Sequence, residues 1–320
     1  MLVVAALGIS SIADSSSVFA FAIRSSVRTT SSPVHHASTI APLTPIPLVP
    51  FISPAVAGEG QWRPAGRLVD GHPAIYTTTL RLPDSPSIVA GVAWMNNHLL
   101  RARLYSGSLS PGGLFWKYTA PVSPAASRTL VAAFAGGFIL KVSQGGYFSE
   151  GHLIAPLRVG AASFVIYKNG LATVGQWGRD VNMSSNVIAV RQNLRLLVDR
   201  AQPVPGLNPH DVSAWGASLY SIVDTPRSGL GITSTGALVY VSGPMNILDL
   251  ARTLVRAGAV RAMVLDMNPL WPVFATYAPH PNNAPATPAN GTDLLRTMEQ
   301  TPGRFFEAAY ARDFITMSVP

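Results

Sequence analysis

The stretch Asn246–Asp266, NILDLARTLVRAGAVRAMVLD, predicts a helix that leads directly into a buried strand. Asn246 can cap the first turn of the helix, and Gly258 ends it. One apolar stripe at helical spacing consists of Ile247, Leu250, Ala251, Leu254 and Val255. The unbroken apolar run Ala262–Leu265 then predicts a strand that is buried on both faces. This strand presents Asp266 at its carboxyl end, which is where sites form in α/β sheets.

β-Hairpins precede this stretch. Asn169-Gly170 joins two β-like runs and predicts a type I′ turn, because both residues tolerate positive φ angles. Ser234-Thr235-Gly236 joins the next pair of runs, with Gly236 in the left-handed position. Further strands, in a first sheet segment, are predicted at Ala74–Leu82, Ser87–Trp94 and Leu99–Tyr105. We therefore expect an α/β fold of the mixed α+β kind: one large domain with a mixed twisted sheet, β-hairpins and packed helices.

The N-terminal part differs in composition from the rest. Residues 1–57 are predicted to be an apolar N-terminal segment and a Pro/Ser/Thr-rich tether, because repeated proline fixes φ and removes hydrogen-bond donors. The apolar stretches of Met1–Ile23 are too short to span a membrane and carry no basic residues before them, so they fit a frayed N-terminus and a damaged export signal equally well. Residues 58–320 are predicted to form the folded domain. A tether before a domain favours an extracytoplasmic protein, either secreted or membrane-anchored.

The composition limits the class of function. The 320 residues carry a net charge of +8, which suits an anionic membrane face, a nucleic acid or a polyanionic wall polymer. The basic residues are scattered rather than clustered, which disfavours nucleic acid. The chain has no cysteine, so disulfides and cysteine-based zinc sites or nucleophiles are excluded. The motifs of serine hydrolases, zincins and nucleotide enzymes are also absent from the sequence. Nothing in the sequence indicates a metal or cofactor.

Two carboxylates have surroundings typical of a site. Glu150 lies in the glycine-bearing stretch Gly145–Gly151, where the backbone could approach a ligand, although a turn with a solvated glutamate is an equally simple interpretation. Asp266 emerges from an apolar strand and must be paired or hydrogen-bonded, because an isolated buried charge is costly. It could act in chemistry or cap the loop that follows.

The other candidates are groups that could hold an anion or a sugar. Arg227 enters the second hairpin and could bind a phosphate through two parallel hydrogen bonds, or form an ordinary surface ion pair. The Gly136-Gly137 pair after an apolar run could form a backbone anion nest or simply a tight bend. Further polar candidates without a spacing that specifies a reaction are Asn268, Asp180 and His210.

Several of these segments, in this order and spacing, resemble the phosphodiester glycosidase family, which includes the mannose 6-phosphate uncovering enzyme. The segments that carry the resemblance are Ala132–Phe138, Arg227–Thr233 and Leu248–Asp266, within roughly Leu130–Tyr277. The strings Val174–Asp180 and Val190–Leu194 resemble those of a bacterial branch of exported members.

The chain departs from the family pattern at two places. Ala135 stands where the family has asparagine before Gly-Gly, and Met267-Asn268-Pro269 stands where it has a glycine-rich run after Leu-Asp. Either departure could shift the substrate or abolish turnover.

The resemblance implies hydrolysis of a sugar-1-phosphate diester in an extracytoplasmic glycan or wall polymer. In this hypothesis Asp266 and Glu150 do acid–base or cation-stabilising work, while Arg227 and the Gly136-Gly137 backbone hold the phosphate. It requires these side chains to converge on one pocket. The alternative is a non-catalytic surface protein that binds anionic glycans, and a membrane-tethered scaffold for protein partners is a third possibility.

Overall fold

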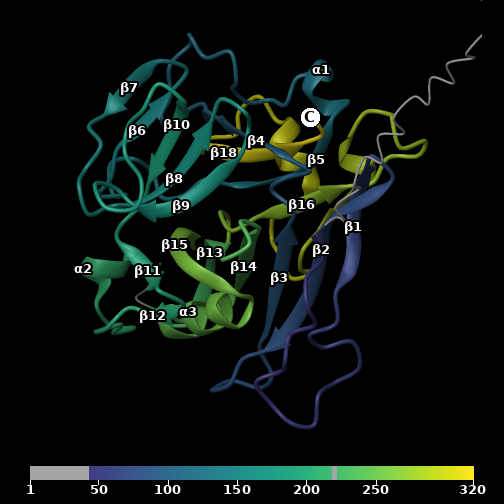
Figure 1. The fold of residues 1–320 in the computed structure, drawn as a ribbon, viewed down its shortest axis with the longest axis vertical. Helices are drawn as coiled ribbons and strands as arrows, with labels where there is room; N and C mark the ends of the chain where they lie inside the picture. Colours follow the sequence, from purple (N-terminus) through teal and green to yellow (C-terminus); the bar gives the residue numbers. More distant parts are fainter. Residues whose placement is uncertain (1–42, 218–221) are drawn as a thin grey trace, which may run out of the picture. The chain divides into compact units, whose positions relative to one another are not determined.

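The computed structural model describes residues 43–217 and 222–320, and strands dominate this part of the chain (Figure 1). Every pairing between its named strands is antiparallel. The prediction of a mixed sheet is therefore wrong. The predicted packed helices reduce to one ten-residue helix, α3 (Ile247–Arg256), with the other described helical segments being no longer than five residues.

The first sheet has eight strands and carries most of the predicted elements. In spatial order they are β1 (Arg63–Val69), β2 (His72–Arg81), β3 (Val89–Met95), β14 (Leu238–Met245), β13 (Thr225–Thr233), β15 (Ala259–Met267), β11 (Leu196–Asp199) and β12 (Gln202–Pro203). Helix α3 connects β14 to β15, which run parallel to each other but are separated by the antiparallel strand β13. A strand–helix–strand crossover is thus present without any parallel pairing.

Two five-stranded sheets complete the structure. One contains β7 (His152–Ala155), β6 (Tyr147–Ser149), β10 (Val187–Gln192), β8 (Ala162–Tyr167) and β9 (Ala172–Gln176). The other contains β17 (Gly291–Asp293), β16 (Phe274–Tyr277), β5 (Leu130–Ala135), β18 (Phe314–Ser318) and β4 (Arg101–Tyr105). Strand β4 was expected beside β2 and β3, but it pairs with β18, some 210 residues further along the chain.

Short helical segments lie between strands of the same sheet. They are α1 (Pro124–Ser127), α2 (Val212–Trp215) and the 3₁₀ segments Pro288–Asn290 and Pro302–Phe306. The segment 279–292 is held against the domain at Asn282, which exchanges two hydrogen bonds with the Leu68 backbone at 2.9 and 3.0 Å. The segment 304–312 packs on the domain, with Tyr310 fully buried.

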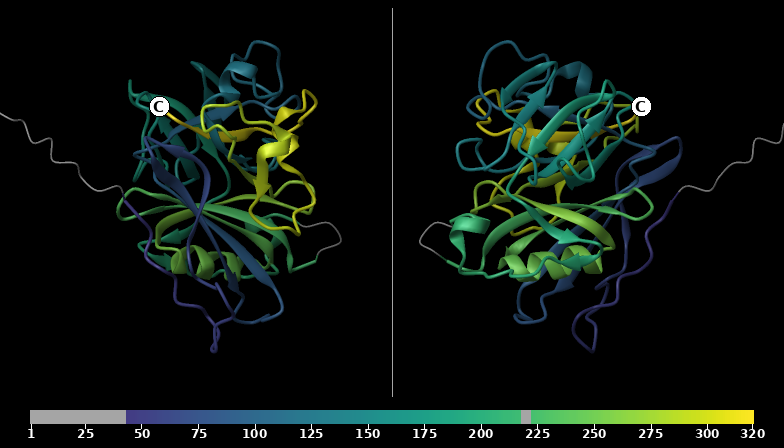
Figure 2. Two further views of the ribbon diagram at one scale, coloured as in Figure 1. Left: turned by 90° about the vertical axis from the view of Figure 1, so that its right-hand side faces the viewer. Right: turned by 60° about the vertical axis from the view of Figure 1, so that its left-hand side comes forward.

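The predicted helix is confirmed, and it packs on one side of the first sheet. The Asn246 side chain accepts hydrogen bonds from the N–H groups of Leu248 and Asp249, both at 3.0 Å, so it caps α3. The apolar face of α3 packs on one side of the first sheet (Figure 2). On the other side, a second cluster joins Tyr240 of the first sheet to Phe164 of the second and Phe134 of the third.

Both predicted hairpins exist, but one turn has a different geometry. Gly236 has the expected left-handed φ of 83° between β13 and β14. At Asn169-Gly170 only Gly170 has a positive φ, of 79°, so the type I′ prediction is wrong. Tyr167 accepts a hydrogen bond from the Gly170 N–H and donates one to the Leu171 carbonyl oxygen. This is a three-residue loop with glycine at the bulge, a geometry that leaves Asn169 in an ordinary backbone conformation.

The described end of the predicted tether, residues 43–57, contains neither helix nor strand but lies against the domain. The Leu48 N–H donates to the Gly60 carbonyl oxygen at 2.9 Å, and the Trp62 indole donates to the Ile46 carbonyl oxygen at 2.7 Å. The guanidinium of Arg256 lies 4.4 Å from the ring of Phe51. Residues 43–57 therefore contact the domain, which a free tether would not do. The domain boundary at residue 58 stays a prediction. The remaining part of that segment lies outside the described residues.

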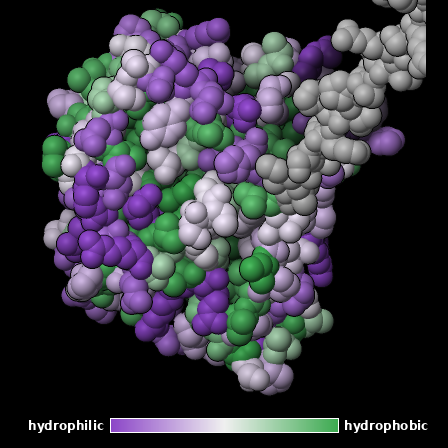
Figure 3. All heavy atoms as spheres, viewed as in Figure 1, coloured by the Kyte–Doolittle hydropathy of each residue, from purple (hydrophilic) through white to green (hydrophobic). Residues whose placement is uncertain are grey.

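The surface carries scattered polar groups. On the face shown in Figure 3, hydrophilic side chains alternate with separate hydrophobic patches. Within the described ranges, the structure has no helix of the length and apolar character needed to cross a membrane.

Candidate functional site around Asp266

Asp266 lies near the carboxyl end of β15, and only 1% of its surface is exposed. One carboxylate oxygen accepts a hydrogen bond from the Met267 N–H at 2.8 Å, whereas Oδ2 has no hydrogen-bond partner. Burial raises the pKa of Asp266 to about 7, and the nearby Arg312 opposes this rise. A carboxyl group with such a pKa can both give and take a proton near neutral pH.

Arg312 faces this carboxylate. Its Nη1 lies 3.8 Å from the Asp266 Oδ2, is itself buried and has no hydrogen-bond partner. The guanidinium lies 4.3 Å from the ring of Trp271, which fixes its plane. About 11% of the Arg312 side chain is exposed, so the pair borders the surface. These two buried atoms, one a donor and one an acceptor, therefore keep unused hydrogen-bonding capacity that a polar ligand atom can satisfy.

A fully buried ion pair lies behind Asp266. The Arg191 Nε lies 2.7 Å from the Asp313 Oδ2, and neither side chain has any exposed surface. Arg191 also donates to the carbonyl oxygens of Phe138 and Gln192. The charge of Asp313 adds to the rise in the pKa of Asp266, and that of Arg191 opposes it. Asp266 therefore lies in a buried cluster of two acids and two arginines, in which Arg312 faces Asp266 and Arg191 pairs with Asp313.

The Gly136-Gly137 pair lies beside this network, but not as the predicted anion nest. The Gly136 N–H donates to the Asp313 backbone oxygen at 2.8 Å, so it is not available to a ligand. A Cβ at Gly136 would lie 2.2 Å from the Asp313 carboxylate, so close packing against Asp313 requires glycine at this position. Gly137, with φ of 150°, would place a Cβ 3.4 Å from both Arg191 and the carbonyl oxygen of Leu265.

Arg227 lies on the opposite face of the first sheet from Asp266. In the β13–β15 register Arg227 lies opposite Met267, and its Nε donates to the Met245 carbonyl oxygen at 3.1 Å, on the side of α3. The next residue, Ser228, faces the other way, and its hydroxyl accepts from the Asp266 N–H at 3.1 Å. The predicted convergence of Arg227 with Asp266 is therefore wrong.

A β-bulge causes this separation. Gly229 lies opposite Val264, so a regular ladder would place Arg227 opposite Asp266 and both side chains on one face. The register shifts between these pairs, and one extra residue in β15 moves Arg227 opposite Met267 instead.

Arg227 is nevertheless an unusual arginine. It is 3% exposed, its Nη1 has no hydrogen-bond partner, and burial lowers its pKa to about 10. It lines a cavity of about 210 Å³ together with His210, an exposed loop residue. Asn268, at φ of 76°, donates its N–H to the Pro226 carbonyl oxygen at 2.9 Å and so lies beside the strand of Arg227. The structure thus brings together Arg227 and His210.

Glu150 and Asp180 hold loops in place. The two Glu150 carboxylate oxygens accept hydrogen bonds from the N–H groups of Lys117 and Tyr118, at 2.8 and 2.9 Å. Asp180 accepts from the Gln176 N–H at 2.8 Å and pairs with Arg179 at 2.7 Å. Among the described residues no hydrogen bond or ion pair joins either acid to Asp266, and the convergence of Glu150 with Asp266 on one pocket stays a prediction. Residues 43–217 and 222–320 contain no group of three acids or histidines arranged to hold a metal ion.

Sequence reasoning missed Arg312, Asp313, Arg191 and Trp271. One signal was available, because the charged pair Arg312-Asp313 directly precedes the apolar run Phe314–Met317. A charged pair at the entrance of a buried strand must find partners. Arg191 had no comparable signal, since its acidic partner Asp313 is 122 residues away in the sequence.

The chain was compared with known families and proteins. Residues 128–266, which end on the buried acid, match the phosphodiester glycosidase family. None of the curated proteins matches the chain.

The solved structures that are similar to the chain include the following three. The catalytic domain of zebrafish N-acetylglucosamine-1-phosphodiester alpha-N-acetylglucosaminidase, auto-inhibited by its pro-peptide, is 15% identical with a TM-score of 0.45, over 81% of this chain and 87% of that one. A hypothetical protein from Synechocystis is 12% identical with a TM-score of 0.43, over 78% and 63%. A protein of Burkholderia pseudomallei K96243 described as exported is 12% identical with a TM-score of 0.40, over 75% and 76%.

Proposed function

We propose that the chain, which belongs to the phosphodiester glycosidase family through residues 128–266, hydrolyses a sugar-1-phosphate diester in an extracytoplasmic glycan or wall polymer. The observation that carries the proposal is the buried Asp266 carboxyl group, at the end of the matching segment, facing the unpaired guanidinium nitrogen of Arg312. The extracytoplasmic location rests on the composition of residues 1–57.

The reaction divides into two tasks that this site suits. Water adds to the anomeric carbon as the bond from that carbon to the phosphate oxygen breaks, giving a free sugar and a phosphate monoester. The departing phosphate carries negative charge, which the Arg312 guanidinium can bind through charge-assisted hydrogen bonds. Asp266, with a pKa near neutrality, can take the proton from the attacking water or stabilise the cationic sugar. Arg312 thus takes the phosphate role that the sequence assigned to Arg227.

The test uses the full chain and methyl phosphodiesters of glucose, mannose and N-acetylglucosamine linked through C1, with release of reducing sugar as the readout. We expect turnover of at least one diester, and a loss of about 100-fold or more in kcat/KM for Asp266→Asn and for Arg312→Gln. Asp84→Asn, an exposed acid paired with Arg252, is the matched control and keeps the activity. Thermal unfolding of each variant separates lost chemistry from lost folding.

Arg227→Gln decides between the two faces of the sheet. Activity that survives Arg227→Gln but not Arg312→Gln supports the assignment to Arg312. The reverse pattern would contradict it and return the phosphate to the Arg227 face.

A second candidate function is binding of an anionic glycan without turnover. It is favoured by the separation of Arg227 from Asp266 and by the residues Ala135 and Met267-Asn268-Pro269, which depart from the family pattern. Retention of the chain on an anionic glycan, with no sugar released from any diester in the panel, would support this candidate over the enzyme.

A further inference from the structure

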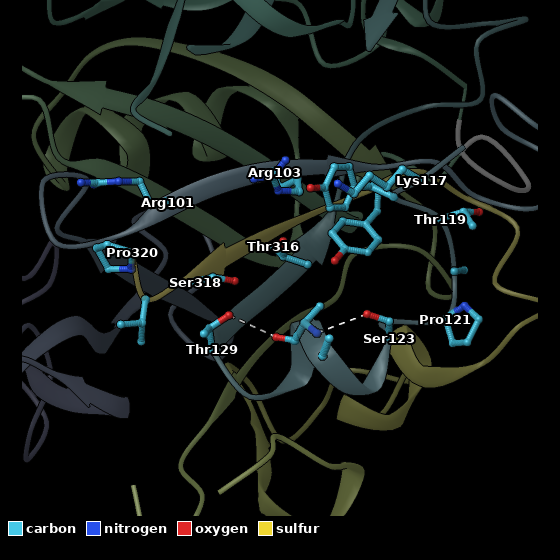
Figure 4. A pocket seen from close by; sticks show the side chains of 16 residues that line it. Arg101, Arg103, Lys117, Thr119, Pro121, Ser123, Thr129, Thr316, Ser318 and Pro320 are labelled. Carbon is cyan, nitrogen blue, oxygen red and sulfur yellow. Dashed lines mark hydrogen bonds between the residues drawn. The ribbon is translucent and has the colours of Figure 1, made fainter. Parts of the chain in front are cut away.

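A cavity of about 560 Å³ lies at the edge of the third sheet, apart from Asp266 and from Arg227. Figure 4 shows Arg101, Arg103 and Lys117 along one side of it, Ser123 and Thr129 on the other, and Thr316 between them. Three basic side chains line the cavity, and no aspartate or glutamate side chain does.

The register of β4 and β18 places several of these side chains along the cavity. Arg101 and Arg103 are alternate residues of the edge strand β4, so their side chains leave the same face. In the register with β18, Arg101 lies opposite Ser318 and Arg103 opposite Thr316. Each of these two arginines therefore has a hydroxyl-bearing neighbour across the strands, at the spacing of a cross-strand pair.

The cations are held in place without being neutralised. The Arg103 guanidinium lies 4.0 Å from the ring centre of Tyr118, and the Lys117 ammonium lies 5.4 Å from the same ring. Arg101 donates to the carbonyl oxygens of His98 and Leu100, at 3.3 and 3.1 Å. Among the ion pairs of the described residues, none involves Arg101, Arg103 or Lys117.

Glu150, an acid next to the Lys117 backbone, already accepts hydrogen bonds. Glu150 receives the backbone N–H groups of Lys117 and Tyr118, which orients the loop that carries Lys117. The other arginine side chains that line the two candidate sites either pair with an acid or are buried, whereas Arg103 and Lys117 line an open cavity. Cations that line a concave surface concentrate anions there.

We propose that this cavity binds a phosphorylated saccharide, with Arg103 and Lys117 on the phosphate and the hydroxyl groups of the opposite wall on the sugar. The aromatic ring of Tyr118 holds the two cations, and the volume suits one or two sugar units. The site is separate from the Asp266 site and does not depend on hydrolysis there.

The test measures binding by titration calorimetry at fixed ionic strength, using the full chain with Asp266→Asn to prevent turnover. The probes are glucose 1-phosphate, glucose and inorganic phosphate. Glucose 1-phosphate is expected to bind, and Arg103→Gln with Lys117→Gln is expected to weaken it at least about tenfold, because two charge-assisted contacts are lost. The control pair Arg296→Gln and Lys168→Gln removes the same charges from exposed positions elsewhere and leaves the affinity unchanged.

Three outcomes would overturn the proposal: no binding of glucose 1-phosphate at millimolar concentration, equal affinity in the double variant and the control, or tighter binding of an oligothymidylate than of the sugar phosphate. If the double variant fails to fold, Lys117→Gln alone replaces it, because Lys117 is exposed. Lys117→Arg keeps the positive charge and is expected to retain binding. Binding that persists while Asp266→Asn abolishes turnover keeps both proposals. Normal turnover together with unchanged glucose 1-phosphate binding in the cavity variants counts against this inference alone.

Discussion

Asp266 combines full burial with a raised pKa, and this combination makes the protein's stability depend on pH. The pKa of Asp266 is about 7 in the folded state and near 3.8 in an unfolded chain. The folded protein therefore holds a proton between these values that the unfolded chain has lost. The stability from this group is present in full below about pH 4 and is lost as the pH rises through 7.

We expect the free energy of unfolding of the wild-type protein to fall, relative to that of Asp266→Asn, as the pH rises from about 4 to 7. This relative fall in the free energy of unfolding should be on the order of a few kcal/mol. Urea titrations of both proteins across this range measure it. A difference between the two proteins that does not change with pH would show that Asp266 stays ionised throughout.

At the scale of elements, α3 depends on its cap. Asn246 satisfies two backbone N–H groups at the start of the helix and donates to the Asp249 carboxylate at 2.9 Å. Asn246→Ala is expected to lower the free energy of unfolding by about 1 kcal/mol, measured by urea denaturation. Asn246→Ser keeps an oxygen acceptor and should lose less. Equal losses in the two variants would contradict the capping role and point to the contact with Asp249.

The whole molecule depends on the buried ion pair between Arg191 of β10 and Asp313 before β18, which joins the second and third sheets. Asp313→Asn leaves a buried guanidinium uncompensated, so we expect a loss of about 3–5 kcal/mol in the free energy of unfolding. Replacing both partners, as Arg191→Met with Asp313→Leu, should cost less than Asp313→Asn alone, because no buried charge remains.

The exposed pair Arg304–Glu307, at 2.7 Å, is the comparison. Glu307→Gln should change the free energy of unfolding by less than about 1 kcal/mol, because solvent screens an exposed pair. If Asp313→Asn cost no more than Glu307→Gln in the same thermal and urea measurements, the buried pair would not be what joins the two sheets.

Features that depend on neighbours in the chain could be predicted from the sequence. The spacing of Asn246 and the apolar stripe after it determined α3, and the run Ala262–Leu265 determined β15 with Asp266 near its end. The resemblance to the phosphodiester glycosidase family could be inferred too, because its motifs are short segments in a fixed order.

Only the tertiary structure decided which side chains meet. A one-residue bulge in β15 places Arg227 and Asp266 on opposite faces, and residue types alone do not fix such a shift in register. The partners that Asp266 does have, Arg312 directly and Arg191 and Asp313 behind it, come from distant segments that the pairing of β18 with β5 and the packing of the sheets bring together. The chain encodes its elements locally, whereas the site arises from contacts between segments that are far apart in the sequence.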